Sequence, residues 1–194
     1  MTPVARASAA CLMLFCTSAS AADDTGRFVV EGVGRIDCAR FLDEQSKNSP
    51  VFHAVFGWID GYSTAFNTLR PDTFDVTPWE TTELLLLKLS HHCGTRPQDR
   101  IGDAVAALFR TLEPNRLQAW SEPSQARNGD SVVVLYTEVF RRIGAALTKL
   151  GLLPEGERQV FDQAMGLALM EFQRGAGLPA SGLPDQPTLN ALLR

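Results

Sequence analysis

The run Ser90-His91-His92-Cys93 gathers residue types that could act as nucleophile, base or metal ligand. Adjacent histidines on a helix point about 100° apart, so they do not converge as the four ligands of a zinc site must. Ser90 lacks the glycine-rich turn that presents a nucleophilic serine. We therefore predict no catalytic residue, no metal site and no cofactor. A histidine that senses pH is favoured over a metal ligand, because an unperturbed imidazole titrates near pH 6.5.

The first 21 residues have the pattern of a secretory signal peptide. Arg6 supplies an early positive charge, residues 9–16 form a short apolar core, and Ala19-Ser20-Ala21 offers a small-residue cleavage site. The apolar core is too short to cross a bilayer as a helix. We expect cleavage after Ala21, a periplasmic location and no membrane insertion.

Removal of residues 1–21 would leave only two of the four cysteines, Cys38 and Cys93. An even pair of cysteines in an exported chain is typical of one disulfide, because oxidising compartments favour the bridge. We predict a Cys38–Cys93 disulfide, with two free buried thiols as the alternative. In the chain-entropy model, closing a loop of this length would stabilise the fold by about 4 kcal/mol.

The composition is that of a soluble globular chain. Of 194 residues, 45% are hydrophobic and 21% are charged, and the formal net charge is −4. No basic stripe dominates, so we do not expect nucleic-acid binding. The length allows one or two small domains. A segment rich in Pro, Ser, Asn and Gly over 121–130 predicts a linker between domains at 22–120 and 131–194.

Apolar residues recur at three- and four-residue steps through residues 22–120, which predicts helices. One helix covers 51–69, and another begins at Thr77-Pro78, where Thr77 would be the N-cap, and runs to Cys93. A further helix covers 101–112, and a short one opens at Cys38. We expect this half to be all-α, with the disulfide joining its first and third helices.

Residues 131–194 are predicted to form a three-helix unit. The helices would cover about 131–150 and 160–174, followed by a short last helix capped by Asp185. Alternation of apolar residues is only weakly indicated at 132–135. The predicted fold class is therefore all-α: two small helical modules, of which the first is stapled by the disulfide.

The segment from Leu169 to Leu192 resembles the second half of a peptidoglycan-binding-like domain, and the resemblance covers about residues 138–193. It rests on a helix that ends in Phe-Gln, a Gly-Leu pair, a glycine turn and an Asp-x-x-Thr start to a Leu-rich helix. Each part of the motif has an expected physical role. The phenylalanine anchors the helix in the core, the two glycines permit tight turns, and the Asp and Thr exchange capping bonds. The residues that carry these roles are Phe172, Gly177, Gly182, Asp185 and Thr188.

This resemblance implies peptidoglycan as a partner. The loop between the last two helices joins two helix ends, where exposed polar groups gather. We therefore predict that Gln173, Arg174, Ser181 and Asp185 border the groove that meets the polymer.

Residues of about 31–112 resemble, less specifically, the HdeA/HdeB-type periplasmic acid-stress chaperones. The resemblance rests on Cys38-Ala39-Arg40-Phe41-Leu42, on residues 56–62 and on Leu89-Ser90-His91-His92-Cys93. It implies a small helical domain with one disulfide, a protein-interaction or stress-protective role, and periplasmic proteins as possible partners.

The sequence thus predicts an exported, non-catalytic protein that associates with peptidoglycan through its C-terminal module. The first alternative is an HdeA-like acid-stress chaperone whose C-terminal module is purely structural. A weaker alternative is an accessory or divergent enzyme of cell-wall remodelling.

Overall fold

The computed structural model describes residues 23, 25, 27–156 and 158–193. The predicted signal peptide at 1–21 and its cleavage site lie outside these residues. The chain divides into two compact units, 1–30 and 31–194. In the first unit, the Asp23 carboxylate accepts hydrogen bonds from the backbone N–H groups of Thr25 and Arg27. The helices and strands described below belong to the second unit.

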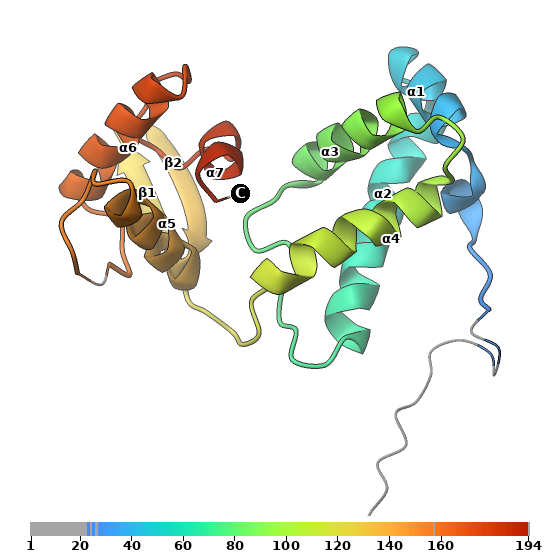
Figure 1. The fold of residues 1–194 in the computed structure, drawn as a ribbon, viewed down its shortest axis with the longest axis horizontal. Coiled ribbons are helices and arrows are strands. Elements are labelled where there is room, and N and C mark those ends of the chain that lie inside the picture. Colours follow the sequence, from blue (N-terminus) through green and yellow to red (C-terminus); the bar gives the residue numbers. More distant parts are fainter. Residues whose placement is uncertain (1–22, 24, 26, 157, 194) are drawn as a thin grey trace, which may run out of the picture. The chain divides into compact units, whose positions relative to one another are not determined.

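The first half of the larger unit is helical, as predicted (Figure 1). Its elements are η1 (Gly32–Arg35), α1 (Cys38–Ser46), α2 (Pro50–Leu69), α3 (Thr82–Thr95), α4 (Ile101–Leu112) and η2 (Glu113–Asn115). They enclose a core that includes Phe41, Ile59, Leu85, Leu89, Ile101 and Phe109. The predicted disulfide is confirmed: Cys38 of α1 bonds to Cys93 of α3, and their Cα atoms are 4.8 Å apart.

Helix α3 begins four residues later than predicted. Thr81, and not Thr77, is its N-cap, and the Thr81 hydroxyl accepts a hydrogen bond from the backbone N–H of Leu84. The backbone N–H of Thr77 is instead bound by the Asp75 carboxylate, 3.0 Å away. The Trp79 side chain packs into the core of the second half. These contacts hold residues 77–81 outside the helix.

The second half begins with a β-hairpin, which corrects the predicted linker and helix start. Strands β1 (Pro123–Asn128) and β2 (Ser131–Tyr136) pair in antiparallel register, Asn128 opposite Ser131. Gly129 opens the two-residue loop with a φ of 57°, a value that glycine adopts readily. Successive β-branched valines favour the strand over a helix. The all-α prediction is therefore only roughly right: the fold is mostly helical with a small two-stranded sheet.

Three helices follow the hairpin: α5 (Thr137–Lys149), α6 (Gln163–Gly175) and α7 (Gln186–Leu192). Asp162 caps α6 and accepts from the backbone N–H of Met165. The core of this half includes Phe140, Ile143, Leu147, Met165, Leu169 and Leu189. Trp79 and Leu84, which precede and open α3, are buried in the same core. The two halves of the larger unit therefore share apolar packing.

No helix in the described part of the chain is long and apolar enough to cross a membrane.

Candidate functional site

The predicted polymer-contact residues lie around the loop between α6 and α7. Gln173 is fully buried. Its Nε2 lies within hydrogen-bond distance of Ser181 Oγ (3.1 Å), Leu183 O (2.9 Å) and Thr188 Oγ1 (2.9 Å). Its Oε1 accepts from the backbone N–H of Gly182 at 2.8 Å. The structure therefore gives Gln173 a different role from the predicted one: it fastens the loop to α6 instead of facing a ligand.

The capping of α7 is also different in part from the prediction. The Asp185 carboxylate accepts from the backbone N–H of Thr188 at 3.0 Å, as expected for an N-cap. The Thr188 hydroxyl is buried against the Gln173 amide, so it does not return a bond to Asp185. The cap and the buried amide thus form one connected polar network.

Both predicted turn glycines have positive φ angles. Gly177 and Gly182 each have a φ of 69°. A Cβ at Gly182 would lie 2.9 Å from Met170 Cγ and 3.1 Å from the Gly166 carbonyl oxygen, whereas a Cβ at Gly177 meets nothing within 4 Å. Gly182 therefore serves both the turn and close packing on α6, while Gly177 serves the turn alone. Phe172 packs against the core, partly buried.

The other three predicted contact residues, Arg174, Ser181 and Asp185, are less buried than Gln173. Arg174 is exposed in the last turn of α6. Ser181 is partly buried, and its carbonyl oxygen accepts from the Asn128 side chain of β1 at 2.8 Å. The loop is thus tied to the hairpin as well as to α6.

Beside this loop, α6 and the end of β1 line a cavity of about 390 Å³, which we call the α6 groove. Arg127, Asn128, Asp162 and Gln163 supply polar groups, and Phe161, Leu167 and Met170 supply apolar ones. Sugar rings offer both hydroxyl groups and apolar faces. A wall of this mixed character is suited to them, because ligand sites combine apolar area with a few placed polar groups.

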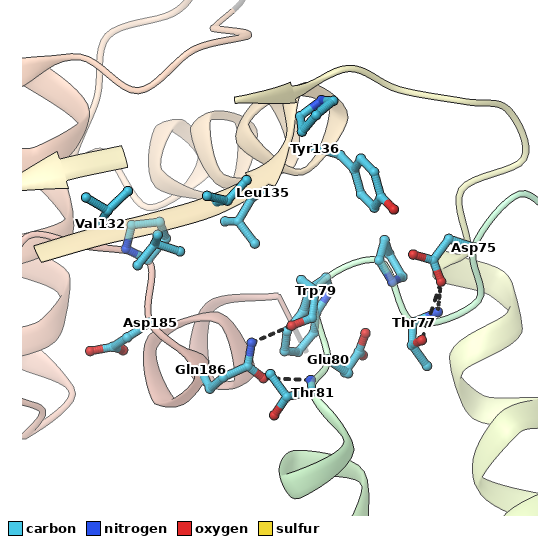
Figure 2. A pocket seen from close by; sticks show the side chains of 15 residues that line it. Asp75, Thr77, Trp79, Glu80, Thr81, Val132, Leu135, Tyr136, Asp185 and Gln186 are labelled. Atoms are coloured by element: carbon cyan, nitrogen blue, oxygen red, sulfur yellow. Dashed lines mark hydrogen bonds between the residues drawn. The ribbon is translucent and has the colours of Figure 1, made fainter. Parts of the chain in front are cut away.

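A larger cavity of about 630 Å³ lies between residues 77–81 and strand β2, and we call it the junction cleft (Figure 2). Trp79, Tyr136 and Asp185 are among its lining residues. Gln186 of α7 also lines the cleft: its Nε2 donates to the Trp79 carbonyl, and its Oε1 accepts from the backbone N–H of Thr81 at 3.1 Å (Figure 2). These bonds fix residues 79–81 to the second half.

Glu80 is the most perturbed acid at the junction cleft. Its side chain is 4% exposed, and its Oε2 is buried without a hydrogen-bond partner in the described structure. Burial raises the pKa of Glu80 from 4.5 to about 7, although the charge of Lys88, whose Nζ lies 3.9 Å from Oε1, opposes the change. The Lys88 ammonium also lies 5.4 Å from the centre of the Trp79 ring.

The histidine and serine side chains of the run at 90–93 do not form one site, because His92 and Ser90 bond to different partners. His92 Nε2 lies 2.8 Å from the Asp99 carboxylate, and the Ser90 hydroxyl donates to the Leu86 carbonyl at 2.8 Å. His91 is exposed. Across the described ranges, no group of three or more His, Cys, Asp or Glu residues is placed to hold a metal ion.

Residues 140–192 match the family described as "Putative peptidoglycan binding domain". The match begins in α5 and ends with α7, so it contains the α6–α7 loop and its buried Gln173. It confirms the resemblance of this segment to peptidoglycan-binding domains. No curated protein and no solved structure matches the chain, so the HdeA-like resemblance of the first half stays a prediction.

The junction cleft was not among the sequence predictions. Its two walls are the segment 77–81 and strand β2, and the sequence pattern predicted both as helix. The Gly129-Asp130 pair, which the run Val132-Val133-Val134 follows one residue later, is the signal that could have identified the hairpin.

Proposed function

We propose that this protein is an exported, non-catalytic protein that associates with peptidoglycan through its C-terminal module, residues 131–194. The observation that carries the proposal is the family match over 140–192, in a segment whose Phe-Gln and Asp-x-x-Thr motifs meet in one hydrogen-bonded network. The disulfide is compatible with an oxidising compartment outside the cytoplasm.

The α6 groove is the surface that we assign to the polymer. Arg127 of β1 and Gln163 of the first turn of α6 line it and supply polar groups. Exposed Arg174 lies at the other end of α6, where it can meet carboxylates of the wall. The N-terminal helical half then serves as a protein-interaction module.

Co-sedimentation with insoluble peptidoglycan tests this proposal. Residues 22–194 should appear in the pellet, and Arg127→Ala, Gln163→Ala and Arg174→Ala should each reduce the bound fraction several-fold. Arg110→Ala is the matched control, because Arg110 is exposed on α4, outside the matched segment. A folded wild-type protein that stays in the supernatant at low and moderate salt would refute the proposal.

A separate experiment tests the proposal that the protein is not an enzyme. Incubation of the protein with purified peptidoglycan should release no soluble fragments over many hours. Release of such fragments would favour the wall-remodelling enzyme instead.

The disulfide-stapled first half keeps a second function open, that of an acid-stress chaperone. Acid protonates carboxylates near pH 4, so net charge becomes strongly positive and self-repulsion loosens the helices. The Cys38–Cys93 bridge would keep the loosened chain looped while apolar faces of α2 become accessible. Suppression of client aggregation at about pH 2–3, absent at pH 7 and lost on reduction, would support this function.

A further inference from the structure

The junction cleft follows the free edge of strand β2. Successive side chains of a strand point to opposite faces of the sheet, yet all five residues 132–136 line this cleft. A cavity can touch consecutive residues of a strand only if it runs along the backbone edge. From β1, only Pro123 contributes to the lining. The cleft is therefore a slot beside β2, with residues 77–81 as its opposite wall (Figure 2).

The outer backbone groups of β2 are available for pairing. The residues that flank a two-residue hairpin loop form a hydrogen-bonded pair, and such pairs alternate along an antiparallel ladder. Asn128 and Ser131 flank the loop. The N–H and C=O groups of Val132 and Val134 therefore point away from β1, whereas the carbonyl of Tyr136, the N-cap of α5, faces the first turn of that helix. Among the described residues, no recorded hydrogen bond uses the outward groups of Val132 and Val134.

The size of the slot fits one extended peptide segment. Residues 132–136 span about 14 Å at the rise of about 3.4 Å per residue of an antiparallel strand. A volume of about 630 Å³ lies within the range of ligand sites in proteins. The addition of a strand to an exposed sheet edge is a common mode of peptide recognition.

The charge of the slot selects the peptide. Asp75, Glu80 and Asp185 line it, and none of the described lining residues is Lys or Arg. The Asp75 carboxylate accepts from Thr77 and also bonds to the Tyr136 side chain, and the Asp185 carboxylate accepts from the backbone N–H of Thr188. Burial raises the pKa of Glu80 to about 7 and Lys88 lies close to it, so the negative charge of the slot comes chiefly from Asp75 and Asp185.

We propose that the junction cleft binds an extended, basic segment of a partner protein, which adds to the sheet as a third strand beside β2. Backbone hydrogen bonds to Val132 and Val134 give the register. Basic side chains of the partner lie near Asp75 and Asp185, and apolar ones lie against Trp79 and the exposed valines of β2. This site is separate from the α6 groove.

A labelled heptapeptide of alternating lysine and valine, capped at both ends, is the probe. Fluorescence anisotropy with residues 22–194 should show saturable binding. The affinity should fall several-fold as the salt concentration rises from about 0.05 to about 0.5 M, because salt screens the attraction between the charges of the peptide and the cleft. A peptide with glutamate in place of lysine should bind at least tenfold more weakly. A peptide N-methylated at alternate backbone nitrogens should also lose at least tenfold, because it cannot donate along one edge.

Two variants at one position test the strand edge directly. Val134→Pro removes the outward N–H and should reduce affinity at least tenfold, since proline is tolerated in an edge strand when its nitrogen faces outward. Val134→Ala keeps the N–H and should change affinity less than threefold. Val134 is 57% exposed, so its side chain contributes little to the core.

Three results would overturn the proposal: no binding of the basic peptide, equal binding of the N-methylated peptide, or displacement of the peptide by soluble peptidoglycan fragments. The last result would assign the cleft to the wall polymer. Loss of sedimentation with peptidoglycan, with peptide binding intact, would refute the proposed function and leave this inference standing. The N-methylated peptide keeps the test valid if Val134→Pro fails to fold.

Discussion

The buried carboxyl group of Glu80 should make the protein less stable as the pH rises through neutrality. The pKa of this group rises from 4.5 to about 7, chiefly because burial penalises the charged form. The negative charge of Asp75 adds to the rise, and Lys88 opposes it. Between these two pH values the folded state holds a proton that the unfolded state has released. The stabilisation is complete below about pH 4.5 and is lost as the pH passes 7.

The size of the effect follows from the same two values. Each tenfold difference in proton affinity is worth about 1.36 kcal/mol, so the interval from 4.5 to about 7 corresponds to about 3 kcal/mol. The side chain is only 4% exposed, so solvent screens little of this energy. Glu80→Gln removes the titration and retains an oxygen that can accept from Lys88.

Urea unfolding of wild type and Glu80→Gln at pH 5, 6, 7 and 8 provides the measurement. The variant should gain stability relative to wild type by about 2–3 kcal/mol from pH 5 to pH 8. Glu83→Gln is the matched control, because Glu83 is exposed in the first turn of α3. Its difference from wild type should stay nearly constant with pH. Parallel stability curves for wild type and Glu80→Gln would refute the assigned burial of the carboxyl group.

Three further perturbations test the packing around the loop and the disulfide. Gln173→Leu should cost about 2–4 kcal/mol in urea unfolding, because it leaves the buried groups around the amide without partners. Gly182→Ala should cost more than Gly177→Ala in the same assay, by about 1–3 kcal/mol, since only the former meets atoms of α6. Reduction of Cys38–Cys93 should lower stability by about 4 kcal/mol, which thermal unfolding with and without reductant would show as a clear fall in Tm.

Helix spacing in the sequence predicted the parts of the fold that local rules control. The apolar stripe of α4, the helix predicted at 51–69 and the Asp185 cap of α7 all appear where the pattern indicates. Each depends on residues within one or two turns of each other. The disulfide was also predictable, because only two cysteines remain after the predicted signal peptide.

The candidate site was harder to predict, because polar residues look alike in sequence whether they are buried or exposed. Gln173 follows Phe172 at the end of a helix and could have faced solvent. Its burial depends on the turn at Gly182 and on Thr188, which lies fifteen positions later in the chain. The Phe-Gln motif therefore identified the right module and assigned the wrong role to one of its residues.

The two largest errors of the sequence prediction are the helix start at Thr77 and the helix assigned to strand β2. They share a physical cause, and both segments line the junction cleft. Residues 77–81 have an N-cap and a proline suited to a helix start, yet Trp79 is buried in the core of the second half and Gln186 binds the backbone at Trp79 and Thr81. Strand β2 contains apolar residues at spacing that also suits a helix, yet its pairing with β1 decides its conformation. Tertiary contacts outweigh propensity in both segments. Neither segment is helical, and both line the junction cleft (Figure 2). A surface built by long-range contacts in this way cannot be read from local spacing, and its strand edge is the feature most suited to recognising another chain.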